Sequence, residues 1–327
     1  MKRPCLDELR VVVDPNRAES SWCDSSTQIN ELVIKQRSPF RMRLRSISLL
    51  TLALIGAALA PAEPVEAREE TTFCESNVGS PKNLKELKHG LIEGYLGKND
   101  WPNALEVLEA PPKQGSAFHA QDDNISQKNL KLQGSSRWDL AARDADLSFP
   151  RAANIFSCSL GIQISKEATP RLYTLLQRTL TDAGLATYTA KNHYQRPRPF
   201  LSNKQMICTP QDEKGLTTDG SYPSGHTSVG WAWALILSGL QPTQKDAILK
   251  RGLEYGKSRM ICNVHWHSDV QAGLLIGSST VAQLHADPVF RADLRAASEE
   301  IKAQTLLGNI KNSDDCKQEQ AALENRP

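Results

Sequence analysis

Three short segments of the chain carry basic and histidine side chains at a spacing that could do chemistry. They read KNHYQRPRP (191–199), PSGH (223–226) and SRMICNVHWHSD (258–269). Each has an ordinary explanation when read alone: basic residues spaced along a helix usually form a solvated face, and a histidine and an aspartate four residues apart are often a surface pair. Read together, the three segments predict a binding site for an oxyanion such as phosphate.

The cationic residues of these segments match what a doubly charged oxyanion requires. Several fixed cations are needed, and the planar fork of arginine binds phosphate oxygens in pairs. Lys191, Arg198 and Arg259 supply that charge. Ser224 and Gly225 come just before an apolar segment, where a new helix would offer free N–H groups and the positive end of its dipole. We predict that these five residues bind the phosphate.

The histidines supply the reactive groups. His265 and Asp269 are four residues apart, so the carboxylate can hold the proton of one ring nitrogen and leave the other nitrogen free as a nucleophile. His226 follows Gly225 directly and therefore lies beside the predicted phosphate. We predict that His226, His265 and Asp269 are the catalytic residues.

Eleven residue identities, in the order K-x6-R-P, P-S-G-H and S-R-x5-H-x3-D, resemble the signature of the phosphatidic acid phosphatase type 2 (PAP2) superfamily, which includes the vanadium haloperoxidases. Within it the chain looks most like the bacterial class A non-specific acid phosphatases. The likeness extends to RWDLAARDADL (137–147) and to the residues that flank the second and third segments. We judge that it covers residues 80–305.

The resemblance implies an all-α enzyme with a defined role for each residue. His265 would attack phosphorus to form a phosphohistidine, and Asp269 would orient it. His226 would protonate the leaving oxygen and then serve as the base for water. No metal and no other cofactor is implied. The phosphate oxygens would be held by Lys191, Arg198, Ser224, the Gly225 N–H and Arg259.

Four functions are compatible with such a site. The first is a broad-range periplasmic phosphatase for small phosphate esters, with phosphate transfer as a side activity. The second is a vanadate-dependent haloperoxidase, because phosphate and vanadate are near isosteres. The third is a membrane-embedded lipid phosphatase, which the lack of a spanning segment after the leader disfavours. The fourth is a non-catalytic phosphate-binding protein, which would have no use for the two histidines. We expect the first.

Two other patterns are discarded. GLEYGKS (252–258) resembles a nucleotide-binding P-loop, but three residues separate its glycines where that loop has four, and no strand precedes it. A serine hydrolase elbow at Ser224 would need a glycine where Tyr222 stands. His267 makes the third segment read HWH; we expect this histidine to have a surface or supporting role rather than to bind a metal.

The elements that must position these residues are predicted to be helices in a single domain. Ser80-Pro81, Thr169-Pro170 and Asp287-Pro288 each place a capping residue before a proline, as at helix starts. Apolar residues then recur at helical spacing, for example at Leu84, Leu87, Leu91 and Tyr95. Residues 229–240 read as a buried helix, and 267–286 as another.

Two further features concern packing and loops. Gly273 and Gly277, four residues apart in a predicted helix, would let another helix approach closely. Residues 197–223 form the longest irregular stretch and are predicted to be a functional or mobile loop.

The N-terminal region resembles an export signal. Arg43 and Arg45 precede an apolar run and then small residues, so we expect a leader at 42–67, a mature domain at 68–327, and residues 1–41 upstream of the true start at Met42. The run is too short to span a bilayer. We therefore expect a periplasmic protein without a membrane segment after cleavage.

Charge and cysteine content bear on partners and compartment. The net charge of +2 gives no indication of a nucleic-acid partner, and the sequence leaves a homo-oligomer open. Exported proteins use disulfides. Since Cys208 and Cys262 must both come near the site, we predict that they pair. Cys74, Cys158 and Cys316 would then supply one further bond and one free thiol.

Overall fold

The computed structural model describes residues 83–87, 90–308 and 313–325, all of which belong to the unit Glu70–Pro327. The predicted leader (42–67), the residues before it and Cys74 lie outside the described residues. The described residues form helices and no β-strand, with one isolated antiparallel bridge between Glu86 and Ile92. The prediction of an all-α fold is confirmed.

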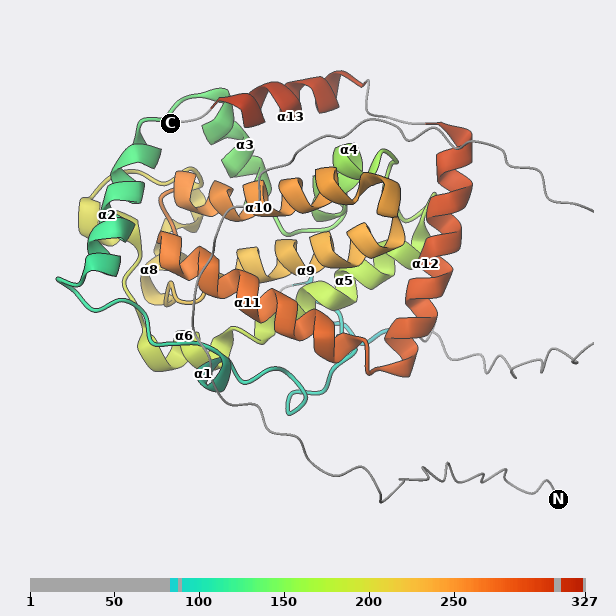
Figure 1. Cartoon of the computed structure of the whole chain (residues 1–327), viewed down its shortest axis with the longest axis horizontal. Helices are drawn as coiled ribbons and strands as arrows, with labels where there is room; N and C mark the ends of the chain where they lie inside the picture. The colour runs from blue at the N-terminus through green and yellow to red at the C-terminus, as the bar shows by residue number, and fades with distance from the viewer. Residues whose placement is uncertain (1–82, 88–89, 309–312, 326–327) are drawn as a thin grey trace, which may run out of the picture. The chain divides into compact units, whose positions relative to one another are not determined.

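The helices are labelled in chain order in Figure 1, where α9, α10 and α11 cross the middle of the view and α12 runs across at one end. The longer helices are α2 (Ala117–Leu130), α3 (Ser136–Asp144), α5 (Pro170–Leu185), α9 (Gly225–Leu240), α10 (Lys245–Ile261), α11 (His267–Leu284), α12 (Pro288–Leu307) and α13 (Asp314–Glu324). The shorter ones are α1 (Ala104–Val107), α4 (Ser157–Leu160), α6 (Tyr188–Tyr194), α7 (Pro199–Asn203) and α8 (Glu213–Thr218), with 3-10 turns at Ala152–Phe156, Pro210–Asp212 and Pro242–Gln244.

Helix α9 is the centre of the hydrophobic core, as its apolar sequence predicts. It packs against α5, α10 and α11. Trp233 and Leu237 on α9 are fully buried, and the Trp233 indole N–H donates to the Leu176 carbonyl on α5 at 3.0 Å. Burying a side chain of this size stabilises a fold by roughly 1.5–3 kcal/mol, so α9 holds its neighbours in fixed positions.

Glycines set how closely α11 approaches α9. A Cβ at Gly273 would lie 2.6 Å from the Ser224 carbonyl oxygen, and one at Gly277 would lie 2.5 Å from that of Ser228. Real Cβ atoms do not approach oxygen so closely, so only glycine permits this crossing. The predicted close approach at these two glycines is confirmed, and it brings the start of α9 onto α11.

The predicted helix through Leu84, Leu87, Leu91 and Tyr95 is wrong. In the described residues this segment is extended around the bridge, and Gly90 has a φ of +74°. Across the bridge the Leu87 N–H donates to the Leu91 carbonyl and the Glu93 N–H donates to the Lys85 carbonyl, and the backbone groups that follow bond to α5. The Asp182 carboxylate accepts the Tyr95 and Leu96 N–H groups, and Arg178 donates to the Gly94 carbonyl. Leu91 and Tyr95 pack against the core cluster that includes Leu172, Leu176 and Leu180 of α5.

Two of the three predicted helix starts lie in the described residues. Asp287 caps α12 by accepting the Phe290 N–H at 2.7 Å, as predicted. Thr169 does precede α5, but its hydroxyl bonds to Ser165 and does not cap the helix. The first free N–H groups of α5 are accepted by the Glu300 carboxylate of α12. The third predicted start, at residues 80–81, lies outside the described residues.

The segment 197–223 is less irregular than predicted, because it contains α7, α8 and a 3-10 turn. A disulfide between Cys208 and Cys262 ties it to the end of α10, which confirms the predicted pair. A second disulfide joins Cys158 on α4 to Cys316 on α13. Each bond closes a long stretch of chain, which restricts the unfolded state.

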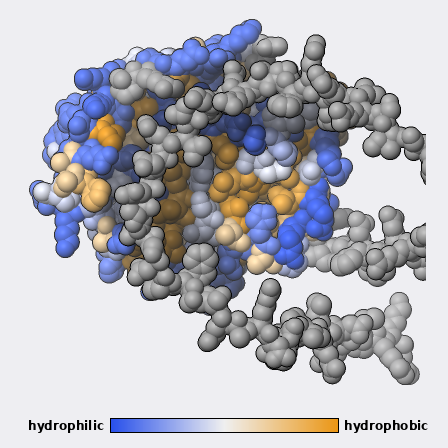
Figure 2. Space-filling view, viewed as in Figure 1, coloured by the Kyte–Doolittle hydropathy of each residue, from blue (hydrophilic) through white to orange (hydrophobic). Residues whose placement is uncertain are grey.

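The surface gives no sign of a spanning element in the described residues. None of their helices is both long enough and apolar enough to cross a membrane. Figure 2 shows hydrophilic residues along the edges of one face and hydrophobic residues toward its middle, over α9 and α11. Residues 252–258 lie inside α10, so the discarded P-loop pattern is part of a helix.

Candidate functional site

The three segments converge on one cavity of about 610 Å³. Of the predicted site residues, those that line it are Lys191, Arg198, Gly225, His226, Arg259 and His265. Ser224 and Asp269 lie directly behind this wall and contact it through hydrogen bonds. Its other side is mostly apolar, with Phe149, Tyr173 and Tyr188 among the lining residues.

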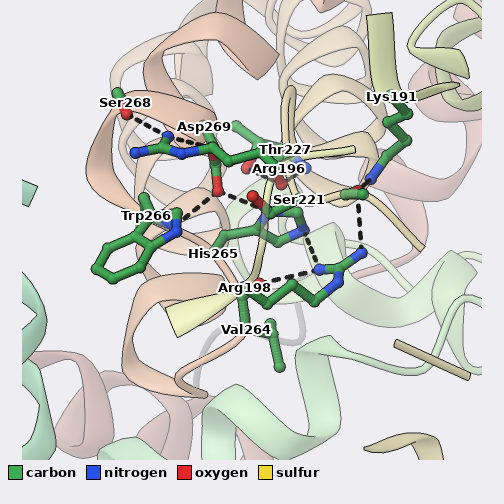
Figure 3. Close-up of polar contacts among 12 residues, drawn as sticks. Lys191, Arg196, Arg198, Ser221, Thr227, Val264, His265, Trp266, Ser268 and Asp269 are labelled. Atoms are coloured by element: carbon green, nitrogen blue, oxygen red, sulfur yellow. Dashed lines mark hydrogen bonds and ion pairs between the residues drawn. The ribbon is translucent and has the colours of Figure 1, made fainter. Parts of the chain in front are cut away.

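The contacts of His265 determine which of its nitrogens carries a proton. Arg198, which only donates, lies 3.1 Å from Nε2, so Nε2 is unprotonated. Nδ1 lies 3.3 Å from the Asp269 carboxylate and is therefore the protonated nitrogen. Figure 3 shows the ring between these two groups. Nε2, with its lone pair, is the nitrogen available for nucleophilic attack.

Asp269 is held by a buried network that the sequence analysis missed. Arg196 donates from Nη1 to Asp269 at 2.6 Å and from Nη2 to Asp122 at 2.8 Å. Asp122, on α2, also accepts the N–H and the hydroxyl of Ser268. The Trp266 N–H donates to the second oxygen of Asp269 at 2.8 Å. Both oxygens of Asp269 thus accept strong donors, which favours the carboxylate form and fixes its direction toward His265.

The surroundings set the charge states of this pair. Burial lowers the pKa of His265 well below its ordinary value, and the nearby cations Arg198 and Lys191 lower it further. A hydrogen bond to the Ser221 backbone opposes that shift. Burial raises the pKa of Asp269, which Arg196 opposes. The free site therefore favours neutral His265, the form that a nucleophile needs.

Lys191, in the last turn of α6, is almost completely buried. Its ammonium donates to the Gly220 carbonyl and lies 3.4 Å from the Asp219 carboxylate. Burial and the neighbouring Arg198 lower the pKa of Lys191 to about 8. It therefore still carries a positive charge across the acidic and neutral range.

Arg259, in the last turn of α10, is buried without the partners that a guanidinium normally has. Its side chain is only 2 % exposed, and its Nε and Nη1 have no hydrogen-bond partner among the described residues. Burial lowers the pKa of Arg259 to about 10, with Tyr255 as the main opposing influence. Buried donors without acceptors cost free energy. An anion in the cavity would satisfy them.

The start of α9 closes the site. Ser224 is the N-cap, with its hydroxyl accepting the Thr227 N–H at 3.2 Å, and its own N–H donates to the Asp269 carbonyl. The Ser224 hydroxyl therefore already has a structural role. A Cβ at Gly225 would lie 3.5 Å from the Thr187 hydroxyl and 3.8 Å from Cε of Lys191, which are ordinary contact distances, so the start of α9 packs against α6 beside Lys191.

His226, in the first turn of α9, is oriented from α3. Its Nε2 lies 3.0 Å from the carbonyl oxygen of Ala145, which can only accept. Nε2 thus carries a hydrogen, and Nδ1 is the nitrogen that gains a proton when the ring becomes charged. Burial lowers the pKa of His226 well below its ordinary value, and Arg259 lowers it further.

Asp144, which the sequence analysis also missed, connects α3 with α10. Its carboxylate accepts from Ser258, the serine beside Arg259, and forms an ion pair with Arg251. It also precedes Ala145, the acceptor for His226. Asp144 lies in the stretch RWDLAARDADL and Arg196 in RPRP. Both stretches were part of the resemblance to the family, but neither residue was assigned a role. Asp219, the fourth missed residue, directly precedes GSYPSGH.

His267 lies outside the cavity, at the start of α11, and is partly exposed. In the described part of the chain, no three His, Cys, Asp or Glu side chains are grouped as metal ligands.

A larger cavity of about 1020 Å³ lies between α3, α4 and α13. It is lined by both acidic and basic residues and by none of the predicted site residues.

Comparison with known proteins agrees with this geometry. The model of the PAP2 superfamily matches residues 172–291. The acid phosphatase of Zymomonas mobilis subsp. mobilis is 40 % identical over 218 residues, which cover 67 % of this chain and 83 % of that protein. The non-specific acid phosphatase of Providencia stuartii is 42 % identical over 207 residues, which cover 63 % of this chain and 84 % of that protein. The non-specific acid phosphatase of Salmonella typhimurium is 40 % identical over 217 residues, which cover 66 % of this chain and 87 % of that protein.

Two adjacent aspartates test the buried network. Asp122 is 1 % exposed and binds Arg196 and Ser268, whereas Asp123 pairs only with His119 at the surface. We expect Asp122→Ala to lower the free energy of unfolding by about 2–4 kcal/mol, because charged hydrogen bonds are lost and Arg196 keeps a single carboxylate. Asp123→Ala should change it by less than about 0.5 kcal/mol. Equal losses in denaturant unfolding would contradict the network.

Proposed function

The chain belongs to the PAP2 superfamily, among its non-specific acid phosphatases, and on that premise we propose that it cleaves phosphate monoesters through a covalent intermediate on His265. The observation that carries this proposal is Arg259: a buried guanidinium with unsatisfied donors, in the same cavity as Lys191, Arg198 and the free nitrogen of His265. A phosphoryl group satisfies those donors and brings phosphorus to the histidine.

The phosphate is held by charge and by the start of α9. Arg259 binds with Nε and Nη1, and Lys191 and Arg198 contribute charge from the opposite wall. The N–H of Gly225 is among the first of α9, where N–H groups lack partners within the helix. Ser224 contributes its hydroxyl hydrogen, since its oxygen already accepts the Thr227 N–H.

In the first chemical step, Nε2 of His265 forms a bond to phosphorus as the bond from phosphorus to the ester oxygen breaks. The ring becomes positively charged, and the Asp269 carboxylate at Nδ1 stabilises that charge. Protonated His226 gives its proton to the leaving oxygen, which departs as an alcohol.

In the second step, water attacks the phosphohistidine. His226, now neutral, takes a proton from the water as the N–P bond breaks. His265 returns to its neutral form, and inorganic phosphate is released. Another alcohol in place of water would give phosphate transfer by the same route.

We also propose that the protein works outside the cytoplasm, in the periplasm. The sequence of residues 42–67 has the order of an export signal, and the described residues contain two disulfides, Cys158–Cys316 and Cys208–Cys262. Every contact named above is to the phosphoryl group, which supports a broad range of phosphate monoesters.

Two substrates with different leaving groups test the role of His226. We expect His226→Ala to lower kcat/KM on an alkyl phosphate by roughly 10²–10⁴-fold, because the alkoxide needs a proton to leave. The loss on a nitrophenyl phosphate should be much smaller. Both assays are run with a chelator present. His267→Ala, a histidine outside the cavity, should leave both rates within about twofold. Equal losses on the two esters in His226→Ala would rule out the general-acid role.

The pH dependence follows from the direction of the pKa shift. His226 must be protonated to act as an acid, so kcat/KM falls as pH rises through its pKa in the free enzyme. Burial and Arg259 place that pKa well below the ordinary value of about 6.5. A bound phosphoryl group brings negative charge and raises it, so the corresponding decline in kcat should lie at higher pH.

Pre-steady-state and steady-state pH profiles of the wild type test whether the decline in kcat lies at higher pH than the decline in kcat/KM. His226→Ala, which has no such acid, should lose the declining limb that the histidine causes. A kcat limb at lower pH than the kcat/KM limb would show that substrate does not raise the pKa, and would contradict the assignment.

A further inference from the structure

The two arginines of the cavity use their donors in opposite ways. Arg259 leaves Nε and Nη1 without partners among the described residues. Arg198, by contrast, has an acceptor for every N–H group. Its acceptors are the carbonyls of Leu216 and Asp219 at Nε, the Val264 carbonyl and His265 at Nη1, and the Asp219 carboxylate and Gly220 carbonyl at Nη2.

The Asp219 carboxylate stands out among these acceptors. One of its oxygens lies 2.7 Å from Nη2 of Arg198 and 3.4 Å from the ammonium of Lys191. It is the only carboxylate among the described residues that line the cavity. Its side chain is 34 % exposed, whereas those of Arg198 and Lys191 are nearly buried. The carboxylate thus reaches two phosphate-binding cations from the solvent side.

A phosphoryl group can reach Arg198 only by replacing one of these acceptors or by sharing a donor with it. The carbonyls belong to backbone that is fixed between helices. His265 must stay, because its nitrogen attacks phosphorus. The Asp219 side chain is the acceptor that is exposed and can turn away, since it lies on the residue that directly follows α8.

We propose that Asp219 is an internal anion that occupies the phosphate-facing donors of Lys191 and Arg198 in the free enzyme and competes with phosphate for them. This inference rests on the proposed function. It makes Asp219 a determinant of phosphate affinity. The carboxylate keeps the two cations in place between turnovers, and it lowers the affinity of the site for the inorganic phosphate that hydrolysis produces.

A purely structural role for Asp219 predicts the opposite sign. If the carboxylate served only to aim Arg198 at the phosphate, its removal would let the guanidinium move, and phosphate would bind more weakly. If it competes with phosphate, removal of its charge strengthens phosphate binding. The direction of the change therefore separates the two roles.

The experiment measures binding of inorganic phosphate to the full chain by titration calorimetry, without turnover. We expect Asp219→Asn, which keeps the shape and removes the charge, to bind phosphate about tenfold more tightly, since a unit charge so near the ligand has a large effect. Asp219→Glu keeps the charge and should stay within about threefold of the wild type. Asp212→Asn, a carboxylate of the same segment that lies outside the cavity, should stay within about twofold.

Kinetics supply a second readout. In Asp219→Asn the inhibition constant of phosphate and the KM of a phosphate monoester should fall together. Asp219→Ser, also neutral but smaller, should change both in the same direction, so the conclusion does not depend on one variant folding well. Weaker or unchanged phosphate binding in both neutral variants overturns the proposal. Absence of phosphate binding in the wild type as well would instead sink the proposed function.

Discussion

Three cationic side chains, Lys191, Arg198 and Arg259, are buried around one cavity, and like charges held so close in a protein interior repel one another. The contacts of the neighbouring groups offset that repulsion in part. Carbonyls from 216–220 and 264 surround Arg198, and Asp219 links it to Lys191. Of these three cations, Arg259 is the one with buried donors that have no partner among the described residues. The fold therefore carries a locally unfavourable charge distribution that a bound anion would offset, as functional sites often do.

The crossing of α9 and α11 makes this arrangement possible. The Ser224 N–H donates to the Asp269 carbonyl at 3.0 Å, so the cap of α9 and the first turn of α11 meet directly. Gly273 allows this contact because any side chain there would strike the Ser224 carbonyl. One crossing thus places the start of α9, at the wall of the cavity, beside the Asp269 carboxylate that contacts His265. The disulfide Cys208–Cys262 fixes the segment that carries Asp219 against the end of α10.

The parts of the site that depend on local spacing could be predicted from the sequence. His265 and Asp269 are four residues apart, and Gly225 opens an apolar helix, so the contact between the two and the place of Gly225 at a helix start follow from local spacing. Arg196, Asp122 and Asp144 could not be assigned in that way. Their partners are 72 to 146 residues away, and a buried ion pair leaves no periodic trace in the sequence. Asp219 was missed because an aspartate before a glycine also has an ordinary explanation as a turn residue.

The helices also divide into those that local spacing predicts and those that depend on distant contacts. Strong apolar runs such as 229–240 were predicted correctly, because burial and periodicity agree there. The stretch from Leu84 to Tyr95 was mistaken for a helix, because its apolar residues fit a helical face. Its backbone instead pairs across the bridge and, at its end, bonds to Asp182 and Arg178 of α5. Periodicity reports which side chains are buried, and it does not report which groups satisfy the backbone.

The identity of the phosphorylated atom tests the account most directly. The wild-type enzyme would be mixed briefly with a phosphate monoester labelled in its phosphoryl group, quenched in alkaline denaturant and mapped by mass spectrometry. The account predicts an acid-labile phosphate on His265 alone, at its Nε2, and the same label in His226→Ala. A label on His226 or on Ser224, or full labelling in His265→Ala, would contradict it.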